Sequence, residues 1–271
     1  MSAAPAEPAA PGTPEPSPHP FLRVERTGEV QAVTLVNPAR RNAQTPSLWR
    51  ALAEVAEQTP DEIRVVVLRG EGLSFSAGID RRMLLLGGVA GEPDMMAVAA
   101  GSAAAMEALI EDFQRGFTAW AQLPAVVVAA VQGHAIGAGF QLALAADLRV
   151  VADDVQLAMR ETALGMVPDL GGTGPLVHLV GYSRALEICA TGRFVGAQEA
   201  VAIGLASAAV PADQLEAATA DLVAALIGTP PDALRALKPL LRKAVDAPVG
   251  DQLAEERRVN AGLIANLARG R

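Results

Sequence analysis

Two short loops rich in glycine and small residues are the first places in this 271-residue sequence that could do chemistry. They are SFSAGID at residues 74–80 and HAIGAGF at residues 134–140, and each follows an apolar run typical of a buried strand. Small residues at such corners let a ligand approach the backbone. Free N–H groups at a helix start can bind an oxygen that gains negative charge. Each loop taken alone is weak evidence, because a glycine after a strand more often makes a simple turn than a site.

Other familiar catalytic patterns do not fit the sequence. The GAG run at residues 137–139 is not a G-x-G-x-x-G fingerprint, and no P-loop lysine follows it. Ser76 and Ser183 lack the G-x-S-x-G setting of a serine hydrolase. The three histidines have no near spacing, so no metal site is expected. Cys189 is the single cysteine, which excludes an intrachain disulfide or a cysteine-based metal cluster.

The elements that must position these loops alternate between strands and helices. A hairpin is expected over 22–27 and 30–36, and buried strands over 64–69, 124–131 and 147–151. Helices are expected at 46–57, 101–122 and from about 138, and then at 173–180, 182–190, 197–202, 212–227, 231–245 and 251–268. Residues 80–100 are ambiguous, because glycines and a proline interrupt them. The alternation predicts an α/β fold with a helical C-terminal part.

Composition narrows the class of protein. Hydrophobic residues make up 51% and charged residues 19%, so a large core can form and other subunits are expected to cover part of the surface. The net charge of −8 argues against nucleic acid and against an anionic membrane as partners. No apolar run is long enough to span a bilayer, and no secretory signal is visible, so a cytoplasmic protein is expected. Residues 1–20 are rich in proline and alanine and are expected to be a disordered tail, with ordered structure beginning near Phe21.

Several motifs in one register resemble the crotonase family of enoyl-CoA hydratases and isomerases. They are VNPARRNAQT at 36–45, FSAGID at 75–80, AVVVAAVQGHAIGAGFQLALAADLRV at 125–150, LAMRETALGMVPDLGGT at 157–173 and GRFVGAQEAVAIGLAS at 192–207. The resemblance covers about residues 21–268. It implies a spiral of ββα units, with a core over 21–210 that binds acyl-CoA and a helical region over 211–271 that forms a homotrimer or a hexamer of paired trimers.

The resemblance also assigns roles to the two loops. The family stabilises a thioester enolate with two backbone N–H groups, and by position these are the N–H groups of Ile79 and Ala138. Alanine replaces the glycine usual at the second position but keeps the donor. Arg40 and Arg41 fall where the family approaches the nucleotide part of coenzyme A, and solvated arginines are the alternative. The residues expected to border the thioester are Ser76, Ala77, Gly78, Ile79, Gly137, Ala138 and Gly139. Coenzyme A would be part of the substrate, and no separate cofactor is expected.

The acids that move protons depart from the usual hydratase pair. Gln141 stands where hydratases carry the first glutamate, and an amide cannot exchange a proton usefully, although it can hydrogen-bond a water or a substrate. Glu161 stands at the second glutamate. Asp169 stands where some dienoyl-CoA isomerases carry an aspartate, although it could instead cap a helix beginning near Gly171. Catalytic roles are therefore predicted for Glu161, Asp169 and Gln141.

Three functions remain open. Double-bond isomerisation of an enoyl-CoA or dienoyl-CoA is favoured, because one carboxylate can take a proton and return it elsewhere. Hydration of a 2-enoyl-CoA, with Glu161 as the sole acid–base group and Gln141 placing the water, is the second. A protein that binds acyl-CoA without catalysis is the third, favoured by the glutamine at 141 and opposed by the retained acids. Residues 80–120 should shape the acyl pocket, but they carry no specificity signal.

Overall fold

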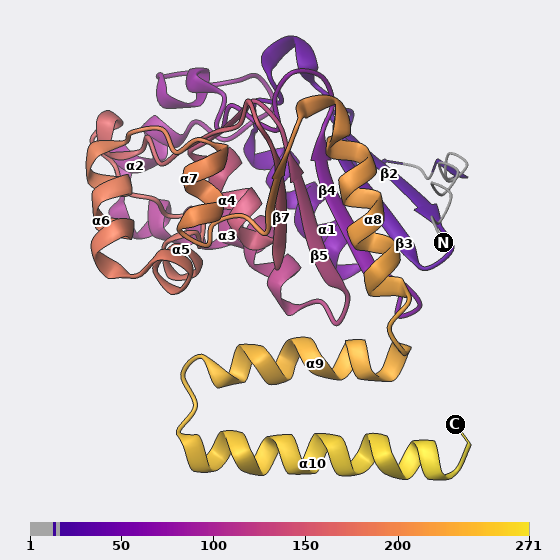
Figure 1. The fold of residues 1–271 in the computed structure, drawn as a ribbon. Coiled ribbons are helices and arrows are strands. Elements are labelled where there is room, and N and C mark those ends of the chain that lie inside the picture. The colour runs from indigo at the N-terminus through magenta and orange to yellow at the C-terminus, as the bar shows by residue number, and fades with distance from the viewer. Residues whose placement is uncertain (1–12, 15–16, 271) are drawn as a thin grey trace.

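A twisted sheet of seven strands, in the order β1-β2-β3-β4-β5-β7-β9, forms the centre of the described chain (Figure 1). The structure, a computed structural model, describes residues 13–14 and 17–270. From β3 to β9 neighbouring strands are parallel, whereas the β1–β2 and β2–β3 pairs are antiparallel. The strands are β1 (Thr13–Pro14), β2 (Leu22–Thr27), β3 (Val30–Leu35), β4 (Val65–Gly70), β5 (Val126–Val131), β7 (Leu148–Ala152) and β9 (Ala208–Val210).

A second, smaller layer is built from the segments that follow the central strands. β6 (His134–Ile136) follows β5, β8 (Gln156–Ala158) follows β7, and the two pair in parallel. Ser76, which follows β4, forms a parallel bridge to Ala135 in β6. The chain therefore repeats a path of long strand, short strand and helix, and the predicted α/β spiral of ββα units is confirmed. Because the short strands stand beside one another, the loops that contain them are brought together.

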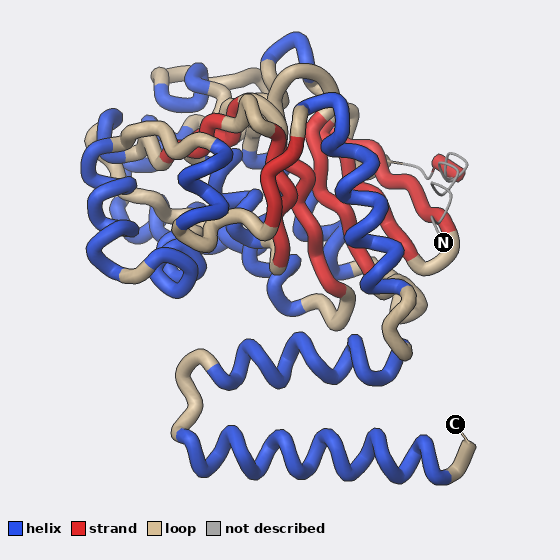
Figure 2. The backbone as a smooth tube through the Cα atoms, viewed as in Figure 1, coloured by secondary structure: helices blue, strands red, loops and turns tan. Residues whose placement is uncertain are grey.

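Helices cover both faces of the large sheet (Figure 2). One face packs against α1, α3 and α4, where Trp49, Phe113 and Phe117 form a fully buried aromatic cluster. The other face packs against α8 through a smaller cluster around Val126, Val150 and Leu215. The helices of the body are α1 (Pro46–Glu57), α2 (Met95–Gly101), α3 (Ala103–Gln122), α4 (Ala138–Ala145), α5 (Thr173–Val180), α6 (Tyr182–Thr191), α7 (Ala197–Ala202) and α8 (Leu215–Ile227). Short 3-10 turns lie at Pro38–Arg40, Arg81–Leu84, Thr162–Leu164 and Ala212–Gln214.

Two C-terminal helices, α9 (Pro231–Ala244) and α10 (Val249–Ala268), extend away from the body (Figure 1). Lys238 anchors α9 to the body, because its buried Nζ lies 2.7 Å from Asp147 Oδ2 and donates to Ala125 O at 2.9 Å. No residue of α10 is buried. The exposed large hydrophobic side chains of these helices are Leu237, Leu241, Val249, Leu253, Ile264 and Leu267. Such apolar surface is what a helix carries when another chain covers it.

The predicted elements agree closely with the observed ones. The helices at 46–57, 173–180 and 197–202 have the expected bounds, and the strands at 64–69, 124–131 and 147–151 differ from the observed ones by two residues at most. The ambiguous segment 80–100 contains a 3-10 turn and most of α2. The short strands β6, β8 and β9 were not predicted. No helix among the described residues combines the length and apolarity that a membrane crossing needs.

The predicted tail differs from the structure at its C-terminal end. Residues 1–12 and 15–16, most of the segment expected to be disordered, lie outside the described residues. Thr13 and Pro14 pair with Arg26 and Glu25 of β2. The half-buried His19 ring lies 3.1 Å from Ser47 Oγ and 5.5 Å from the Phe21 ring. Ordered contacts therefore begin before Phe21, because the imidazole finds polar and aromatic partners on the body.

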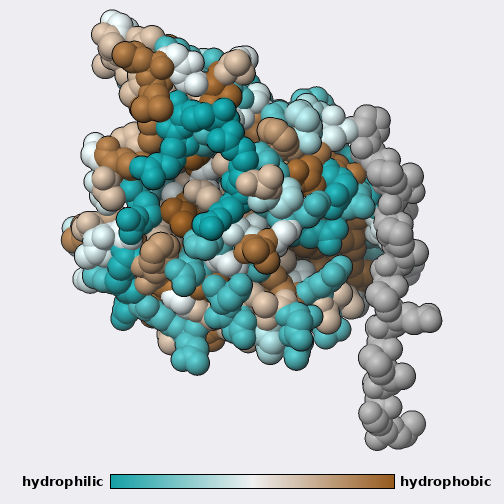
Figure 3. Space-filling view, turned by 90° about the horizontal axis from the view of Figure 1, so that it is seen from above, coloured by the Kyte–Doolittle hydropathy of each residue, from teal (hydrophilic) through white to brown (hydrophobic). Residues whose placement is uncertain are grey.

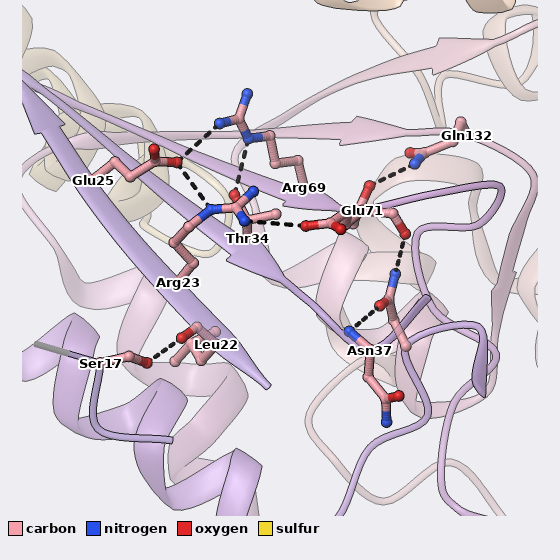
Figure 4. Close-up of polar contacts among 11 residues, drawn as sticks. Ser17, Leu22, Arg23, Glu25, Thr34, Asn37, Arg69, Glu71 and Gln132 are labelled. Atoms are coloured by element: carbon pink, nitrogen blue, oxygen red, sulfur yellow. Dashed lines mark hydrogen bonds and ion pairs between the residues drawn. The ribbon is translucent and has the colours of Figure 1, made fainter. Parts of the chain in front are cut away.

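A network of charged side chains runs across β2, β3 and β4 on one face of the sheet (Figure 4). Glu25 of β2 accepts from Arg23 and from Arg69 of β4, each at 3.3 Å, and Arg69 Nε also donates to Thr34 at 2.9 Å. Cross-strand pairs of this kind each contribute modestly, about 0.2–1 kcal/mol. On the face seen from above, hydrophilic residues form connected areas between separate patches of hydrophobic side chains (Figure 3).

Candidate active site

The two glycine loops lie directly against each other. Ser76 N–H donates to His134 O at 2.9 Å, and Ile136 N–H donates to Ser76 O at 3.0 Å. A Cβ added to Gly78 would lie 2.3 Å from Ile136 O, and one added to Gly139 would lie 2.3 Å from Ser76 O. Both distances are too short for any side chain, so the glycines are what allow the loops to touch. The loops predicted to act together therefore form one unit.

The backbone N–H groups of Ile79 and Ala138 are left without a partner in this unit. Ile79 and Gln44 form a parallel β-bridge, and the hydrogen bonds of this bridge are made by the neighbours of Ile79. Gln44 N–H donates to Gly78 O, and Asp80 N–H donates to Gln44 O. In a parallel bridge the central residue's own N–H then points to the opposite side. Ala138 is the first residue of α4, where an N–H has no intrahelical acceptor. Neither N–H donates to any residue within 13–14 and 17–270.

The segment that precedes α1 holds the first glycine loop in place through side-chain hydrogen bonds. The buried Asn42 accepts from Asn37 N–H at 2.8 Å through Oδ1 and donates through Nδ2 to the carbonyls of Glu71 and Ser74, at 3.0 and 2.8 Å. Asn37 and Glu71 are visible in Figure 4. Gln44 donates to Ser76 Oγ at 2.9 Å. These supporting residues were not identified as such from the sequence, although both lie within the motif at 36–45.

Arg40, one of the two predicted nucleotide-binding arginines, lines a pocket of about 320 Å³. Arg40 is exposed and its guanidinium lies 3.5 Å from Asp80 Oδ2. Arg82 donates to Asp80 at 3.0 and 2.7 Å and lines the same pocket. These hydrogen bonds from Arg82, together with the charge of Arg40, lower the pKa of Asp80. Arg41 is exposed, adopts a left-handed backbone with φ 49°, and is absent from the residues lining this pocket.

Glu161 lies against the second loop. A Cβ on Gly137 would lie 3.3 Å from Glu161 Oε1, so the carboxylate sits beside the residue that precedes Ala138. Gly137 has φ 54° and ψ −119°, a conformation that only glycine adopts readily. Glu161 is 9% exposed, and its Oε2 has no hydrogen-bond partner among the residues that the structure describes. Burial is the main cause that raises the pKa of Glu161, and the charge of Asp169 adds to it.

Gln141 lies between Glu161 and the segment that leads into α5. Its Nε2 donates to Glu161 Oε1 at 2.7 Å, and its Oε1 accepts from Leu170 N–H at 2.9 Å and Gly172 N–H at 3.2 Å. The side chain is 1% exposed. A Cβ on Gly172 would lie 2.8 Å from Gln141 Cγ, so the packing here leaves no spare room. The structure thus brings Gln141 and Glu161 together.

Asp169 lies close enough to Glu161 for its charge to act on that carboxylate. Its backbone carbonyl accepts from Gln114 Nε2 of α3 at 2.7 Å. Burial raises the pKa of its carboxyl. The alternative that Asp169 caps a helix is wrong, because α5 begins at Thr173 and its capping residue is Gly172, with no side-chain capping bond. Gln114 also lines a groove of about 620 Å³ along α3, together with Met106 and Ile110.

Comparison with known proteins decides the family. A family model described as "Enoyl-CoA hydratase/isomerase" matches residues 25–269. The chain belongs to this family. It is 32% identical over 229 residues to "Probable enoyl-CoA hydratase EchA17" of Mycobacterium tuberculosis, covering 84% of this chain and 82% of that protein. It is 31% identical over 240 residues to the "2,3-dehydroadipyl-CoA hydratase" of Escherichia coli, covering 88% of each.

The fold agrees with solved structures of the same family. A crystal structure of a "putative enoyl-CoA hydratase" from Thermobifida fusca, in complex with acetoacetyl-CoA, is 43% identical, with a TM-score of 0.88. The match covers 93% of this chain and 100% of that one. The protein is therefore an acyl-CoA enzyme of the enoyl-CoA hydratase/isomerase family with the crotonase fold. Among the described residues, no group of three or more His, Cys, Asp or Glu side chains could hold a metal ion.

Proposed function

We propose that this family member stabilises a thioester enolate and moves a substrate proton with Glu161, most readily as a double-bond isomerase. The observation that carries the proposal is the position of Glu161. Its carboxylate lies against Gly137, one residue before the unpartnered Ala138 N–H, and one of its oxygens is free of hydrogen bonds within the described chain. A base next to a free N–H donor is what removal of a proton beside a thioester requires.

The thioester would lie between the two loops. The N–H groups of Ile79 and Ala138 would both donate to its carbonyl oxygen, with Ser76–Ile79 and Gly137–Gly139 as the walls. Because negative charge grows on this oxygen as the proton leaves, the two bonds strengthen in the transition state, and losing one such donor typically costs about 3 kcal/mol. The contact between the loops supports this assignment, since it brings the segments that carry the two donors together.

The rest of the substrate would extend to either side. The pocket of about 320 Å³ beside Asp80 carries Arg40 and Arg82 at its rim and would take the nucleotide part of coenzyme A, with Arg41 close by in the chain. Arginine suits this task because its guanidinium binds phosphate oxygens in pairs. The groove along α3 reaches Gln114, which holds the Asp169 backbone, and would take the acyl chain.

Isomerisation needs one proton-transferring group. Glu161 Oε2 would take a proton from carbon 2 of a 3-enoyl-CoA, and the electron pair left on the substrate would spread to the bound carbonyl oxygen. The same carboxyl would return the proton to carbon 4, which leaves the double bond between carbons 2 and 3. Asp169, whose charge acts on Glu161, would assist as a second acid on a dienoyl-CoA.

Hydration is the second candidate, favoured by the names of the relatives. Glu161 would then be the sole acid–base group. Gln141 would contribute only the second N–H of its amide to a water, because its carbonyl oxygen already accepts two backbone N–H groups. The change Gln141→Glu would supply a second acid, and we expect it to raise hydration of crotonyl-CoA.

A substrate panel tests the proposal. Purified protein would be assayed with a 3-enoyl-CoA, a dienoyl-CoA and crotonyl-CoA, and binding of each would be measured separately. Faster turnover of either of the first two supports isomerisation. Preferred turnover of crotonyl-CoA would replace it with hydration. Tight acyl-CoA binding without any turnover would show a binding protein and would overturn the enzymatic proposal.

We also propose that the protein is cytoplasmic and forms a homotrimer or a dimer of trimers. The exposed apolar residues of α9 and α10 support the assembly. Helices with this much uncovered apolar surface are expected to pack against other copies of the chain. Light scattering at micromolar concentration tests the assembly, and a stable monomer would contradict it.

A further inference from the structure

The orientation of the Gln141 amide is fixed by its surroundings. Two backbone donors, Leu170 N–H at 2.9 Å and Gly172 N–H at 3.2 Å, converge on one end, and the Glu161 carboxylate lies 2.7 Å from the other. Turning the amide round would face its NH₂ with two N–H groups and its oxygen with a carboxylate. Only one orientation therefore satisfies every group, and it places the donor on Glu161.

This orientation makes the two oxygens of Glu161 unequal. Oε1 accepts the amide N–H, which occupies one of its two lone pairs and makes it the weaker proton acceptor of the two oxygens. Oε2 is buried and has no partner among the described residues. A buried oxygen left without a partner is rare in folded proteins and points to a group that it is meant to meet. A proton on this carboxyl therefore belongs on Oε2.

We propose that Gln141 is a positioning residue that holds Glu161 through Oε1 and leaves Oε2 as the single oxygen that takes and returns the substrate proton. The inference rests on the proposed function, because it assumes that Glu161 is the base. It differs from the expected role of Gln141 as a holder of water, since the amide oxygen is already fully used by the backbone.

The same side chain also fixes where the second acid lies. Leu170 directly follows Asp169, and its N–H is bound to Gln141, while the carbonyl of Asp169 is held by Gln114. The peptide group that joins Asp169 to Leu170 is therefore held at both its carbonyl and its N–H. Gln141 thus connects Glu161 to the segment that carries Asp169.

Glutamine suits this position better than glutamate for a site with one base. A second carboxylate 2.7 Å from Glu161 Oε1 could not be ionised together with it, so the pair would share a proton. Glutamine keeps the geometry without adding charge. The hydrogen bond from its amide lowers the pKa of Glu161 and opposes the effect of burial. The other titratable groups whose charges act on or respond to Glu161 are Asp169 and Cys189.

Infrared spectroscopy on the intact protein tests the inference without any substrate. The C=O stretch of protonated Glu161 is obtained as the difference between spectra of the protein and of Glu161→Gln, and it is followed as pH rises. The variants are Gln141→Met, which removes the amide, and Gln141→Glu, which keeps an oxygen for the two backbone N–H groups. The matched control is Gln31→Met, which removes another buried glutamine, one that bonds Arg26 of β2 and Thr59.

We expect the Glu161 band to persist to higher pH in Gln141→Met than in the unchanged protein, and to still higher pH in Gln141→Glu, with no shift in Gln31→Met. With the substrate that turns over best, Gln141→Met should lower kcat roughly tenfold to a hundredfold with KM nearly unchanged. The acid limb of its pH–rate profile should move to higher pH.

The inference is overturned if neither Gln141 variant changes the pH at which the Glu161 band disappears. A glutamine whose amide does not contact the Glu161 carboxylate would give that result, with at most a loss of stability shared by Gln31→Met. If Gln141→Met fails to fold, Gln141→Glu decides the question alone. If the unchanged protein turns over no acyl-CoA, the proposed function fails, whereas the infrared titration still decides whether Gln141 sets the ionisation of Glu161.

Discussion

Replacing Glu161 with glutamine should remove most of the turnover and leave the fold intact. The amide has nearly the shape of the carboxyl, and its oxygen can still accept from Gln141 Nε2, which lies 2.7 Å from Oε1. What is lost is the base at Oε2. Loss of a general base typically lowers the rate by about 10²–10⁴, which corresponds to about 2.7–5.4 kcal/mol in the activation free energy.

The same substitution, Glu161→Gln, should raise the stability of the fold although it lowers turnover. Burial raises the pKa of Glu161 above its ordinary value in the folded protein, so the ionised carboxyl destabilises the fold at neutral pH. This destabilisation is fully present above the folded pKa and disappears as pH falls below the unfolded value of 4.5. Glu161→Gln should therefore raise Tm at pH 7, and the gain should shrink as pH falls through that window.

Steady-state kinetics and thermal melts over pH check both parts. We expect kcat to fall and KM for the acyl-CoA to stay nearly constant, because the amide retains the contacts of the carboxyl. Glu57→Gln is the control, since Glu57 is exposed on α1 and pairs only at the surface with Arg115. If Glu161→Gln keeps the kcat of the unchanged protein on its best substrate, Glu161 is not the base and the mechanism is refuted.

Three further results are expected. Asp169→Asn should lower kcat on a dienoyl-CoA by about 10²-fold while a 3-enoyl-CoA is little affected, and equal effects on both substrates would contradict a role as second acid. Ile79→Ala should keep kcat within about threefold, because the donor is in the backbone. Gly78→Ala should lower kcat about 10²–10³-fold, because its Cβ would lie 2.3 Å from Ile136 O and displace the loop. Similar kcat values for the two variants would contradict a role for this loop in the active site. Asn42→Ala should lower the free energy of unfolding by about 2–4 kcal/mol in urea titrations, because its buried amide makes several bonds to the backbone, and an unchanged midpoint would show that the loop support is elsewhere.

The sequence predicts the helices and long strands well because their signals are local. Pro46 at the first turn and the apolar spacing that follows define α1 to the residue. The valine-rich run in β5 is buried at every position, as expected of a central parallel strand. The three-residue strands β6 and β8 carry no such signal, since so few residues show neither alternation nor a run. They exist because the loops around them pack together, which is a property of the tertiary fold.

The supporting residues of the site show the same limit. The motif at 36–45 indicates the family, but its sequence does not predict that Asn42 donates to the carbonyls of Glu71 and Ser74. Those contacts join segments about thirty residues apart in the chain, and only the folded path brings them together. Lys238 is a second case, since a lysine near the C-terminus is buried against Asp147 only because the folded chain brings α9 beside the residues that precede β5 and β7.

Gln141 shows why residue type and register cannot settle the chemistry of this site. Its position in the family motif predicts that an amide replaces an acid. From the sequence alone, that amide could hydrogen-bond either a water or a substrate. The choice depends on Leu170 and Gly172, whose N–H groups occupy its oxygen and turn its NH₂ toward Glu161. These donors are backbone N–H groups, so no pattern of side chains in the sequence predicts them. The glycine at 172 is the sequence feature linked to them, because a Cβ there would lie 2.8 Å from Gln141 Cγ. The glutamine and this glycine therefore form one arrangement, whose physical result is a single free oxygen on Glu161.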